Sequence, residues 1–237
     1  MIKIENTEVV GWEHAIRGMR NPMNSWAKSD SKYCSEYDHP PIEGSCQYCP
    51  YDNICNKSEK DMQQMYLVES NDYDLMTRLR NAGTDHRKFM RMITVYLDIT
   101  APLYWWKEFD TYKVGTVANS CSTMHKIHEK EFTLEDFSTE HLYPEVREAF
   151  ENTIIKYLNE ARKTYNFLSD TPSKKDAWWQ MIQILPTSYN QRRTVMLNYE
   201  VLANIYKSRK GHRLDEWKTM LDWIEELPYA ELITGGK

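Results

Sequence analysis

Side chains that could do chemistry gather in one stretch of this 237-residue chain, residues 101–128. A Lys113-Val-Gly-Thr116 loop is followed there by five consecutive polar residues: Asn119, Ser120, Cys121, Ser122 and Thr123. Hydroxyl, amide and thiol groups with few aliphatic neighbours are typical of a binding site rather than of a packed core. A plain polar loop explains the same residues about equally well, because Ser, Thr and Asn bond to nearby backbone groups.

A second group of reactive side chains is the set of four cysteines within residues 20–60: Cys34, Cys46, Cys49 and Cys55. Hydrophobic periodicity disappears in this range, so we predict an irregular Cys-rich insertion with no core of its own. Four thiolates that bind one metal would cross-link such a segment, and stable disulfides are not expected in a cytosolic chain. Free buried thiols are the alternative to a metal site.

The spacing of these cysteines leaves the metal open between zinc and an iron–sulfur cluster, with His39 as a further candidate ligand. The segment CQYCPYDNIC resembles the element that holds the cluster in RecB-family nucleases. An iron–sulfur nucleic-acid enzyme would rest on the cysteines alone. The formal net charge of −5 opposes it, because nucleic-acid binding normally needs a basic surface.

The remaining composition predicts a soluble, cytoplasmic protein without a membrane or nucleic-acid partner. The sequence has no apolar run of about 18 residues and no secretory signal pattern at its start. Its length allows a single domain over residues 1–237 that carries the insertion.

The elements that must position these groups begin with strands and short helices. Residues 93–100 alternate apolar and polar side chains, which predicts a strand with one buried face. Residues 1–10 carry a short edge-strand pattern. Helices are predicted at residues 12–19, 70–82 and 102–109, the last with Pro102 at its first position.

The C-terminal half is predicted to be helical, over residues 144–167, 172–184, 187–210 and 214–227. Asn198 and Arg209 would then share one face of a long helix, about 16 Å apart along its axis. Arg209 would place a fixed cation over a pocket. Arg192, in the first turns, would meet an anion near free backbone N–H groups.

Residues 108–124 resemble the signature region of flavin-dependent thymidylate synthases, the ThyX family, whose motif reads Arg-His-Arg-x-x-Ser-x-Asn-Glu-x-Ser-x-Arg. Thr111-Tyr112-Lys113 stand in place of Arg-His-Arg, and Thr116 in place of the first Ser. After one inserted residue, Asn119 and Ser122 match the motif. Three further positions differ from the family pattern: Ser120 replaces Glu, Met124 replaces the last Arg, and Glu108 replaces a Gln ahead of the motif.

A second resemblance to the same family lies near the C-terminus, where the family has Leu-Pro, then Asn-x-Arg-x-Leu-x-Asn and a further Arg. The residues that match at those spacings, without a gap, are Leu185-Pro186, Asn198, Leu202, Asn204 and Arg209. Glu200 replaces the central Arg, and Ile182 replaces an Arg shortly before Leu-Pro. The resemblance to the family covers roughly residues 70–128 and 185–217, and it extends to residues 1–18.

The resemblance implies an α/β (α+β) chain with an antiparallel sheet flanked by long helices, assembled as a homotetramer with FAD and dUMP between subunits. The family methylates dUMP to dTMP with carbon from methylenetetrahydrofolate and hydride from NADPH. Arg209 would act at the uracil carbonyls and Ser122 at the nucleotide phosphate, both as catalytic residues. Arg192 and Glu108 would complete the nucleotide side.

The flavin side would be formed by the remaining matched positions: Tyr112, Lys113, Thr116, Asn119, Asn198 and Asn204. Two functions are therefore open. The first is a divergent flavin-dependent enzyme that acts on a deoxyuridine nucleotide. The second is a catalytically silent nucleotide-binding protein on the same fold. Flavin binding discriminates between them.

Overall fold

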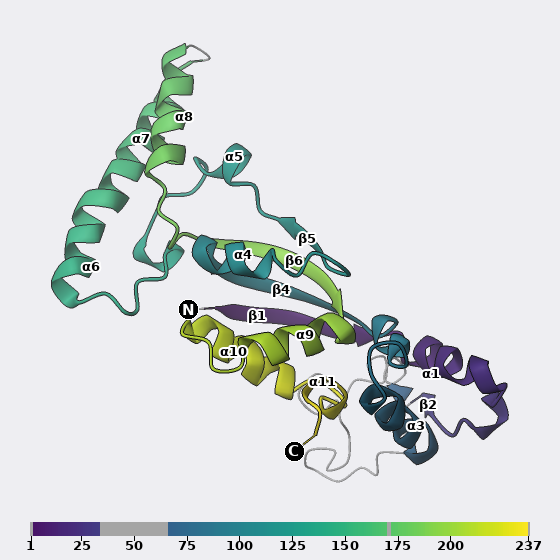
Figure 1. Ribbon diagram of the computed structural model, residues 1–237. Coiled ribbons are helices and arrows are strands. Elements are labelled where there is room, and N and C mark those ends of the chain that lie inside the picture. Colours follow the sequence, from purple (N-terminus) through teal and green to yellow (C-terminus); the bar gives the residue numbers. More distant parts are fainter. Residues whose placement is uncertain (1, 34–65, 170–171, 237) are drawn as a thin grey trace, which may run out of the picture. The chain divides into compact units, whose positions relative to one another are not determined.

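The computed structural model describes residues 2–33, 66–169 and 172–236 (Figure 1). All four cysteines of the predicted metal site, Cys34, Cys46, Cys49 and Cys55, lie outside the described residues. The described ranges form two compact units. One comprises residues 1–3, 98–111 and 118–194, and the other residues 4–97, 112–117 and 195–237. We call them unit 1 and unit 2.

A four-stranded sheet supplies strands to both units, in the order β1-β4-β6-β5. The strands are β1 (Lys3–Val10), β4 (Thr94–Pro102), β5 (Val117–Ser120) and β6 (Asn190–Asn198). Leu103 donates its N–H to the Tyr189 carbonyl at 3.0 Å, and Tyr199 to the Ile93 carbonyl at 3.1 Å. The two bonds join opposite ends of β4 and β6, which makes this pair antiparallel.

Alternation of side chains explains why β4 forms a central strand. Val95, Leu97 and Ile99 are each at most 1% exposed, while the residues between them are intermediate or exposed. A period of two places alternate side chains on one buried face, so the predicted strand is confirmed. The predicted edge strand at residues 1–10 is confirmed as β1, at one edge of the sheet.

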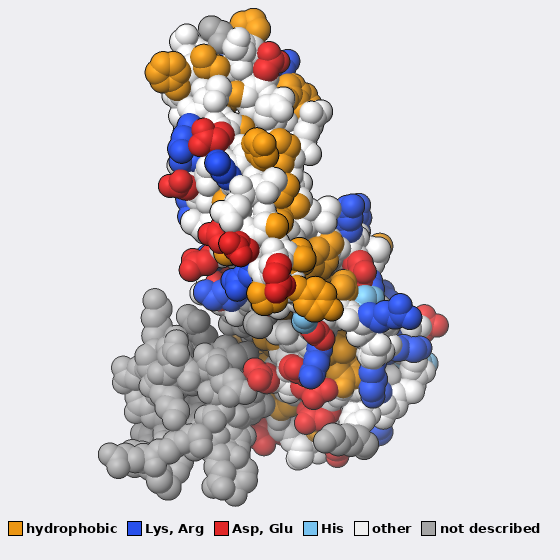
Figure 2. Space-filling view, turned by 90° about the vertical axis from the view of Figure 1, so that its left-hand side faces the viewer, with side chains coloured by type: hydrophobic (Ala, Val, Ile, Leu, Met, Phe, Trp, Pro, Cys, Tyr) orange, Lys and Arg blue, Asp and Glu red, His pale blue; other side chains and the backbone are white. Residues whose placement is uncertain are grey.

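Helices make up most of the rest of unit 1, namely α4 (Leu103–Phe109), α5 (Thr123–Lys126), α6 (Pro144–Phe150), α7 (Lys156–Phe167) and α8 (Pro172–Ile184). A π-helical segment, Glu151–Ile155, joins α6 to α7, so the predicted helix over 144–167 is continuous. Their shared core is apolar: Ile127, Phe132, Phe137, Ile155, Leu158 and Met181. Other large apolar side chains of these helices are exposed, including Phe167 and Tyr157. Hydrophobic side chains are also visible at the surface in the space-filling view of Figure 2.

Unit 2 contains α1 (Trp12–Arg20), α3 (Ser70–Asn81), α9 (Tyr199–Arg209), α10 (Asp215–Glu225) and α11 (Glu231–Thr234). A two-stranded ladder, β2 (Lys32–Tyr33) with β3 (Tyr66–Leu67), lies in the same unit. The core centres on Trp12, whose ring meets Tyr199 and Tyr229 edge-on at 5.3 and 5.0 Å. Trp223 of α10 donates to Thr7 of β1 at 3.1 Å, which ties this helix to the strand beside it.

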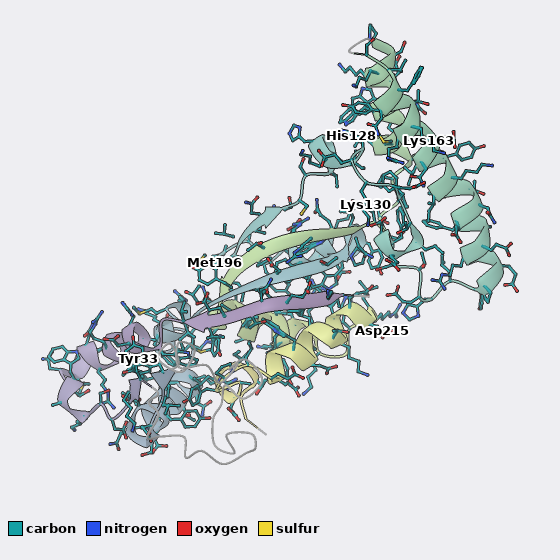
Figure 3. All side chains as sticks on the ribbon, turned by 180° about the vertical axis from the view of Figure 1, so that it is seen from behind. Tyr33, His128, Lys130, Lys163, Met196 and Asp215 are labelled. Carbon is teal, nitrogen blue, oxygen red and sulfur yellow. The ribbon has the colours of Figure 1, made fainter. Side chains whose placement is uncertain are left out.

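The predicted helix over residues 187–210 is wrong in its first half. Residues 190–198 form β6, on which Figure 3 labels Met196, and only α9 is helical. Val195 and Leu197 are fully buried two residues apart, which is strand periodicity. Pairing with β4 and β5 therefore determines this segment, against the helical spacing of Val195, Tyr199 and Leu202.

Smaller differences concern the ends of elements. Strand β5 and helix α11 were not predicted, and the predicted helix over 214–227 is α10, which is shorter at both ends. Pro102 is the last residue of β4 rather than the first of a helix, and α4 begins at Leu103. The predicted helices at residues 70–82 and 172–184 are confirmed as α3 and α8.

The start of the predicted insertion is anchored through one carboxylate. Asp72 is fully buried and accepts hydrogen bonds from Arg20 Nε at 2.6 Å, Ser29 Oγ at 2.8 Å and Ser31 Oγ at 2.7 Å. Asp30 in turn accepts from the N–H groups of Asn71 and Asp72 at the start of α3. The residues just before the cysteines are thus fixed to α1 and α3.

No helix of the described residues has the length and apolarity that a membrane crossing requires.

Candidate functional site

Arg209, the last residue of α9, contacts Tyr112, which lies in the loop between α4 and β5. Its Nε donates to the Tyr112 hydroxyl at 2.9 Å, and its guanidinium carbon lies 5.4 Å from the centre of the Tyr112 ring. Both side chains are half-buried. The structure therefore brings together two residues, 97 positions apart, that the sequence places in the candidate site.

Two aromatic residues that the sequence analysis did not select complete this group. The guanidinium carbon of Arg209 lies 4.4 Å from the centre of the Trp217 ring, which is fully buried at the start of α10. His212 Nε2 lies 3.2 Å from Arg209 Nη1. We call Tyr112, Arg209, His212 and Trp217 the Arg209 cluster. A cation over an indole face gains about 0.5–2 kcal/mol, so Trp217 holds the guanidinium in place.

A tight turn sets the spacing within the Arg209 cluster. Gly211 has φ +76°, a left-handed conformation that favours glycine, and His212 N–H donates to the Arg209 carbonyl at 3.0 Å. The turn places the His212 side chain beside that of Arg209 and leads into α10, whose first residue, Asp215, is labelled in Figure 3. A histidine just after the Arg-Lys-Gly helix end is the sequence signal for this contact.

The loop that carries Tyr112 packs against the start of α9. Gly115 has φ +81°, and a Cβ there would come within 3.0 Å of Asn198 Nδ2 and 3.2 Å of Val201 Cγ2. Asn198 is the N-cap of α9, and its Oδ1 accepts from the Val201 N–H at 3.1 Å. Only glycine suits both the backbone and the space. The predicted flavin residues Lys113, Thr116 and Asn198 therefore lie in one part of unit 2.

The donors of this loop fit a group rich in phosphate and hydroxyl oxygens, such as FAD. Lys113 is exposed, and the buried Thr116 Oγ1 has no hydrogen-bond partner among the described residues. Asn204 is exposed on α9. A buried hydroxyl without a partner is uncommon, and a ligand oxygen is one group that would satisfy it.

The remaining predicted site residues belong to unit 1. Ser122 is the N-cap of α5, and its Oγ accepts from the His125 N–H at 3.1 Å. Asn119 is exposed on β5, and Glu108 is half-buried on α4. Since a serine hydroxyl can donate and accept together, the Ser122 O–H retains its capacity to donate to a phosphate.

Arg192 lies in the middle of strand β6 rather than in the first turns of a helix, so the expected help from the N–H groups of a helix N-terminus does not apply to it. Its Nη2 donates to Asp98 Oδ2 of β4 at 2.7 Å, and Thr194 Oγ1 donates to the other oxygen of the same carboxylate. The Arg192 side chain is 48% exposed, against 15% for Asp98. Its neighbour Arg193 pairs with Asp110 at 2.9 Å and covers the Trp106 ring at 4.1 Å.

Two positions at which the sequence departs from the ThyX pattern carry structural roles. Glu200, where the family has Arg, is buried and pairs with Arg87 at 2.8 Å. Ile182, where the family has Arg, packs against the apolar core of the unit 1 helices. At both positions the replacing side chain is integrated into the packing of its own unit.

The described residues contain no group of three or more His, Cys, Asp or Glu side chains arranged to hold a metal ion. The predicted cysteine site is outside those residues, so zinc or an iron–sulfur cluster stays a prediction.

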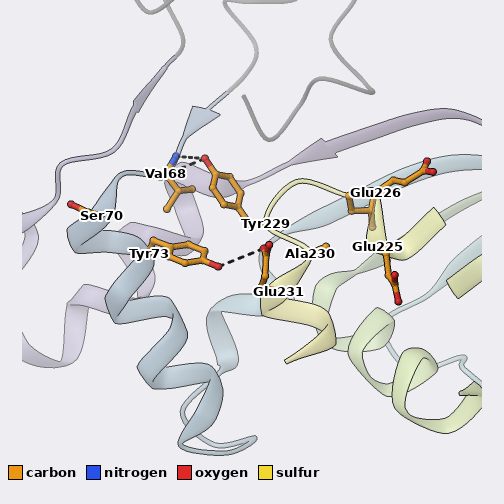
Figure 4. A pocket seen from close by; sticks show the side chains of 9 residues that line it. Val68, Ser70, Tyr73, Glu225, Glu226, Tyr229, Ala230 and Glu231 are labelled. Atoms are coloured by element: carbon orange, nitrogen blue, oxygen red, sulfur yellow. Dashed lines mark hydrogen bonds between the residues drawn. The ribbon is translucent and has the colours of Figure 1, made fainter. Parts of the chain in front are cut away.

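A cavity of about 550 Å³ lies elsewhere in unit 2, between α3 and the segment that joins α10 to α11 (Figure 4). The Tyr229 hydroxyl accepts from the Val68 N–H at 2.7 Å, and Tyr73 contacts Glu231 at 3.5 Å. Burial raises the pKa of Tyr73, and the Glu231 carboxylate raises it further. None of the predicted site residues lines this cavity.

The sequence matches no protein-family model and no curated protein. Solved structures are similar. A crystal structure of thymidylate synthase X (ThyX) from Helicobacter pylori with FAD and dUMP gives a TM-score of 0.63 at 13% identity, over 99% of this chain and 97% of that chain. A second ThyX structure from Helicobacter pylori, also with FAD and dUMP, gives 0.62 at 14% identity, over 98% and 97%. The chain therefore has a ThyX-like fold, with helices and an antiparallel sheet.

Proposed function

We propose that this protein binds a dUMP-type nucleotide and FAD, and acts as a divergent flavin-dependent thymidylate synthase-like enzyme that methylates the pyrimidine ring. The Arg209 cluster carries the proposal. A guanidinium is held there by aromatic groups, on a chain whose fold matches FAD- and dUMP-containing ThyX structures over nearly its full length.

Arg209 would bind the carbonyl oxygens of the uracil ring. A fixed positive charge at those oxygens draws electron density from the ring and makes its C5 more nucleophilic, which is the reaction's requirement. Trp217 and Tyr112 support this role, because their rings restrict the rotation of the guanidinium before a ligand arrives.

FAD would be held by Tyr112, Lys113, Thr116, Asn119, Asn198 and Asn204. When bound, the flavin would pass hydride from NADPH to carbon that methylenetetrahydrofolate delivers. The protein's own contribution is to orient the ring and to supply hydrogen-bond donors. Lys113 is the one cation in this set.

The phosphate of the nucleotide would be bound by Ser122 and Arg192, with Glu108 nearby on the nucleotide side. The Ser122 hydroxyl accepts from a backbone N–H and so presents its own hydrogen outward as a donor.

We further propose that the site forms between subunits of a homotetramer. Light scattering that finds a monomer with full nucleotide affinity would contradict the shared site.

Flavin content and turnover test the proposal. We expect a yellow preparation or flavin released on heating, and conversion of dUMP to dTMP that requires both NADPH and methylenetetrahydrofolate. A protein that binds dUMP but takes up no FAD under any of these conditions would contradict the enzyme.

The second candidate is a nucleotide-binding protein without catalysis. It is favoured by the loss of the family's motif cations at Thr111 and Tyr112 and by the Glu200–Arg87 ion pair at another cation position. Tight dUMP binding without flavin binding would support it over the first.

A further inference from the structure

Arg87 has a guanidinium that its ion pair uses only in part. Its Nη2 donates to Glu200 Oε1 at 3.0 Å, and its Nε lies 2.8 Å from Glu200 Oε2. Within the described residues, Nη1 takes part in no hydrogen bond or ion pair, and it is not buried. Two of the five N–H donors of a guanidinium belong to this nitrogen. Arg87 can therefore donate to a ligand while it stays paired with Glu200.

A second guanidinium makes the charge around Arg87 positive. Burial lowers the pKa of Arg80, and the charge of Arg87 lowers it further. Arg80 donates to the backbone carbonyls of Leu232 and Ile233 at 3.2 and 3.3 Å, which carry no full charge. In the described part of the chain, Glu200 is the carboxylate that pairs with either arginine. Two cations thus share one counter-charge, which favours an anion nearby.

Helix α9 adds an amide beside this charge. Glu200 lies in the first turn of α9, and Asn204 lies one turn later on the same face, since residues four apart on a helix are neighbours. Asn204 is exposed, whereas Glu200 is buried. Guanidinium and amide N–H groups are donors that suit the oxygens of a phosphate group.

We infer that Arg87 and Asn204 bind a phosphate of a diphosphate ligand, and that Glu200 is the positioning residue that fixes the Arg87 guanidinium. The identity of the ligand rests on the proposed function, in which FAD carries the diphosphate and Asn204 belongs to the flavin side. Arg87 then joins Lys113 as a cation for FAD. The Glu200–Arg87 ion pair would position a charge for the cofactor instead of replacing one.

Titrations of FAD and of dUMP test this assignment, with fluorescence for FAD and calorimetry for dUMP. We expect Arg87→Gln to weaken FAD binding about 10-fold or more and to leave dUMP binding within about 2-fold of the parent. Asn204→Ala should weaken FAD binding roughly 3-fold. The matched control is Arg78→Gln, at an exposed arginine of α3 in the same unit, which should change neither affinity.

Changes at Glu200 separate the positioning role from a role in the fold alone. Glu200→Gln keeps an oxygen that can accept from Arg87 and removes the negative charge that competes with a phosphate. We expect this variant to bind FAD as tightly as the parent or up to about 3-fold more tightly. If the ion pair serves the fold alone, Glu200→Gln and Arg87→Gln should weaken FAD binding to the same extent.

The double variant Arg87→Gln/Glu200→Gln leaves no buried charge without a partner, so it serves if Arg87→Gln does not fold. It should lose FAD affinity as Arg87→Gln does. If the double variant binds FAD as tightly as the parent, or loses dUMP affinity equally, the inference is wrong while the proposed function stands. If the parent itself binds no FAD, the proposed function is wrong and this inference is wrong with it.

Discussion

Arg209 and Arg192 stand in different chemical surroundings. Among the contacts of Arg192 is a charge-assisted bond to the Asp98 carboxylate at 2.7 Å. Those described for Arg209 include a phenol oxygen, an indole face and an imidazole nitrogen 3.2 Å from the guanidinium. A ligand anion must compete with Asp98 for Arg192. The hydrogen-bond acceptors described for Arg209 include a phenol oxygen, which holds a cation less strongly than a carboxylate does. Of these two arginines, Arg209 is thus better prepared for a ligand.

A second arginine–carboxylate pair, in unit 2, is buried, whereas Arg192 is half-exposed. Arg20 and Asp72 form an ion pair in which the side chains are 4% and 0% exposed. We expect Asp72→Asn to lower the free energy of unfolding by about 3–5 kcal/mol, because it leaves a buried guanidinium without its counter-charge. The matched change Asp98→Asn should cost at most about 1 kcal/mol, since water reaches Arg192. Urea denaturation measures both, and equal losses would contradict the difference in burial.

The packing of the loop that carries Tyr112, the partner of Arg209, can be tested at Gly115. Gly115 and Gly83 both have positive φ, +81° and +108°, but only Gly115 has side-chain atoms within 4 Å of a built Cβ. Alanine at either position should cost about 1–2 kcal/mol for the backbone alone. Gly115→Ala should cost more than Gly83→Ala in thermal unfolding, because Asn198 or Val201 must also move. The reverse order would show that the loop does not pack as described.

The pH dependence of stability tests the buried carboxylate of Asp72. Burial raises the pKa of Asp72, but hydrogen bonds from Ser31, Ser29 and Arg20 outweigh it and hold the pKa below its ordinary value. The native pKa lies below the unfolded one, so this stabilisation is complete above about pH 4 and is lost as pH falls through the native pKa. Urea denaturation of the parent at a series of falling pH values should show this loss of stability, and Asp72→Asn should lack it.

Much of the fold follows from local sequence signals. The boundaries of α3 and α8 and the alternation in β4 were predicted from spacing, caps and Pro172. Strand β6 was not, because it ends where α9 begins, and Val195 falls in helical register with Tyr199 and Leu202. The strand's own signal is short, with Val195 and Leu197 as its only pair of fully buried apolar residues. Its pairing with β4 and β5 is a long-range property that the local sequence does not carry.

The candidate site likewise contains some residues that the sequence predicted and others that only the structure shows. Arg209 and Tyr112 were selected by resemblance to a known motif, and the structure places them in contact. His212 and Trp217 lie outside the motif, so their contact with Arg209 depends on the turn at Gly211, which spacing alone does not define. The flavin and nucleotide assignments of the other residues stay predictions.

Calorimetric titration of dUMP into the parent, Arg209→Ala and Arg192→Ala under one set of conditions tests directly whether Arg209 recognises the uracil ring. We expect Arg209→Ala to lose about 2–4 kcal/mol of binding free energy, or roughly 30- to 1000-fold in affinity, with its melting temperature within a few degrees of the parent. Arg192→Ala should lose no more than about 1 kcal/mol, or roughly 5-fold. If Arg209→Ala binds dUMP as tightly as the parent does, or less weakly than Arg192→Ala, Arg209 is not the residue that recognises the uracil ring.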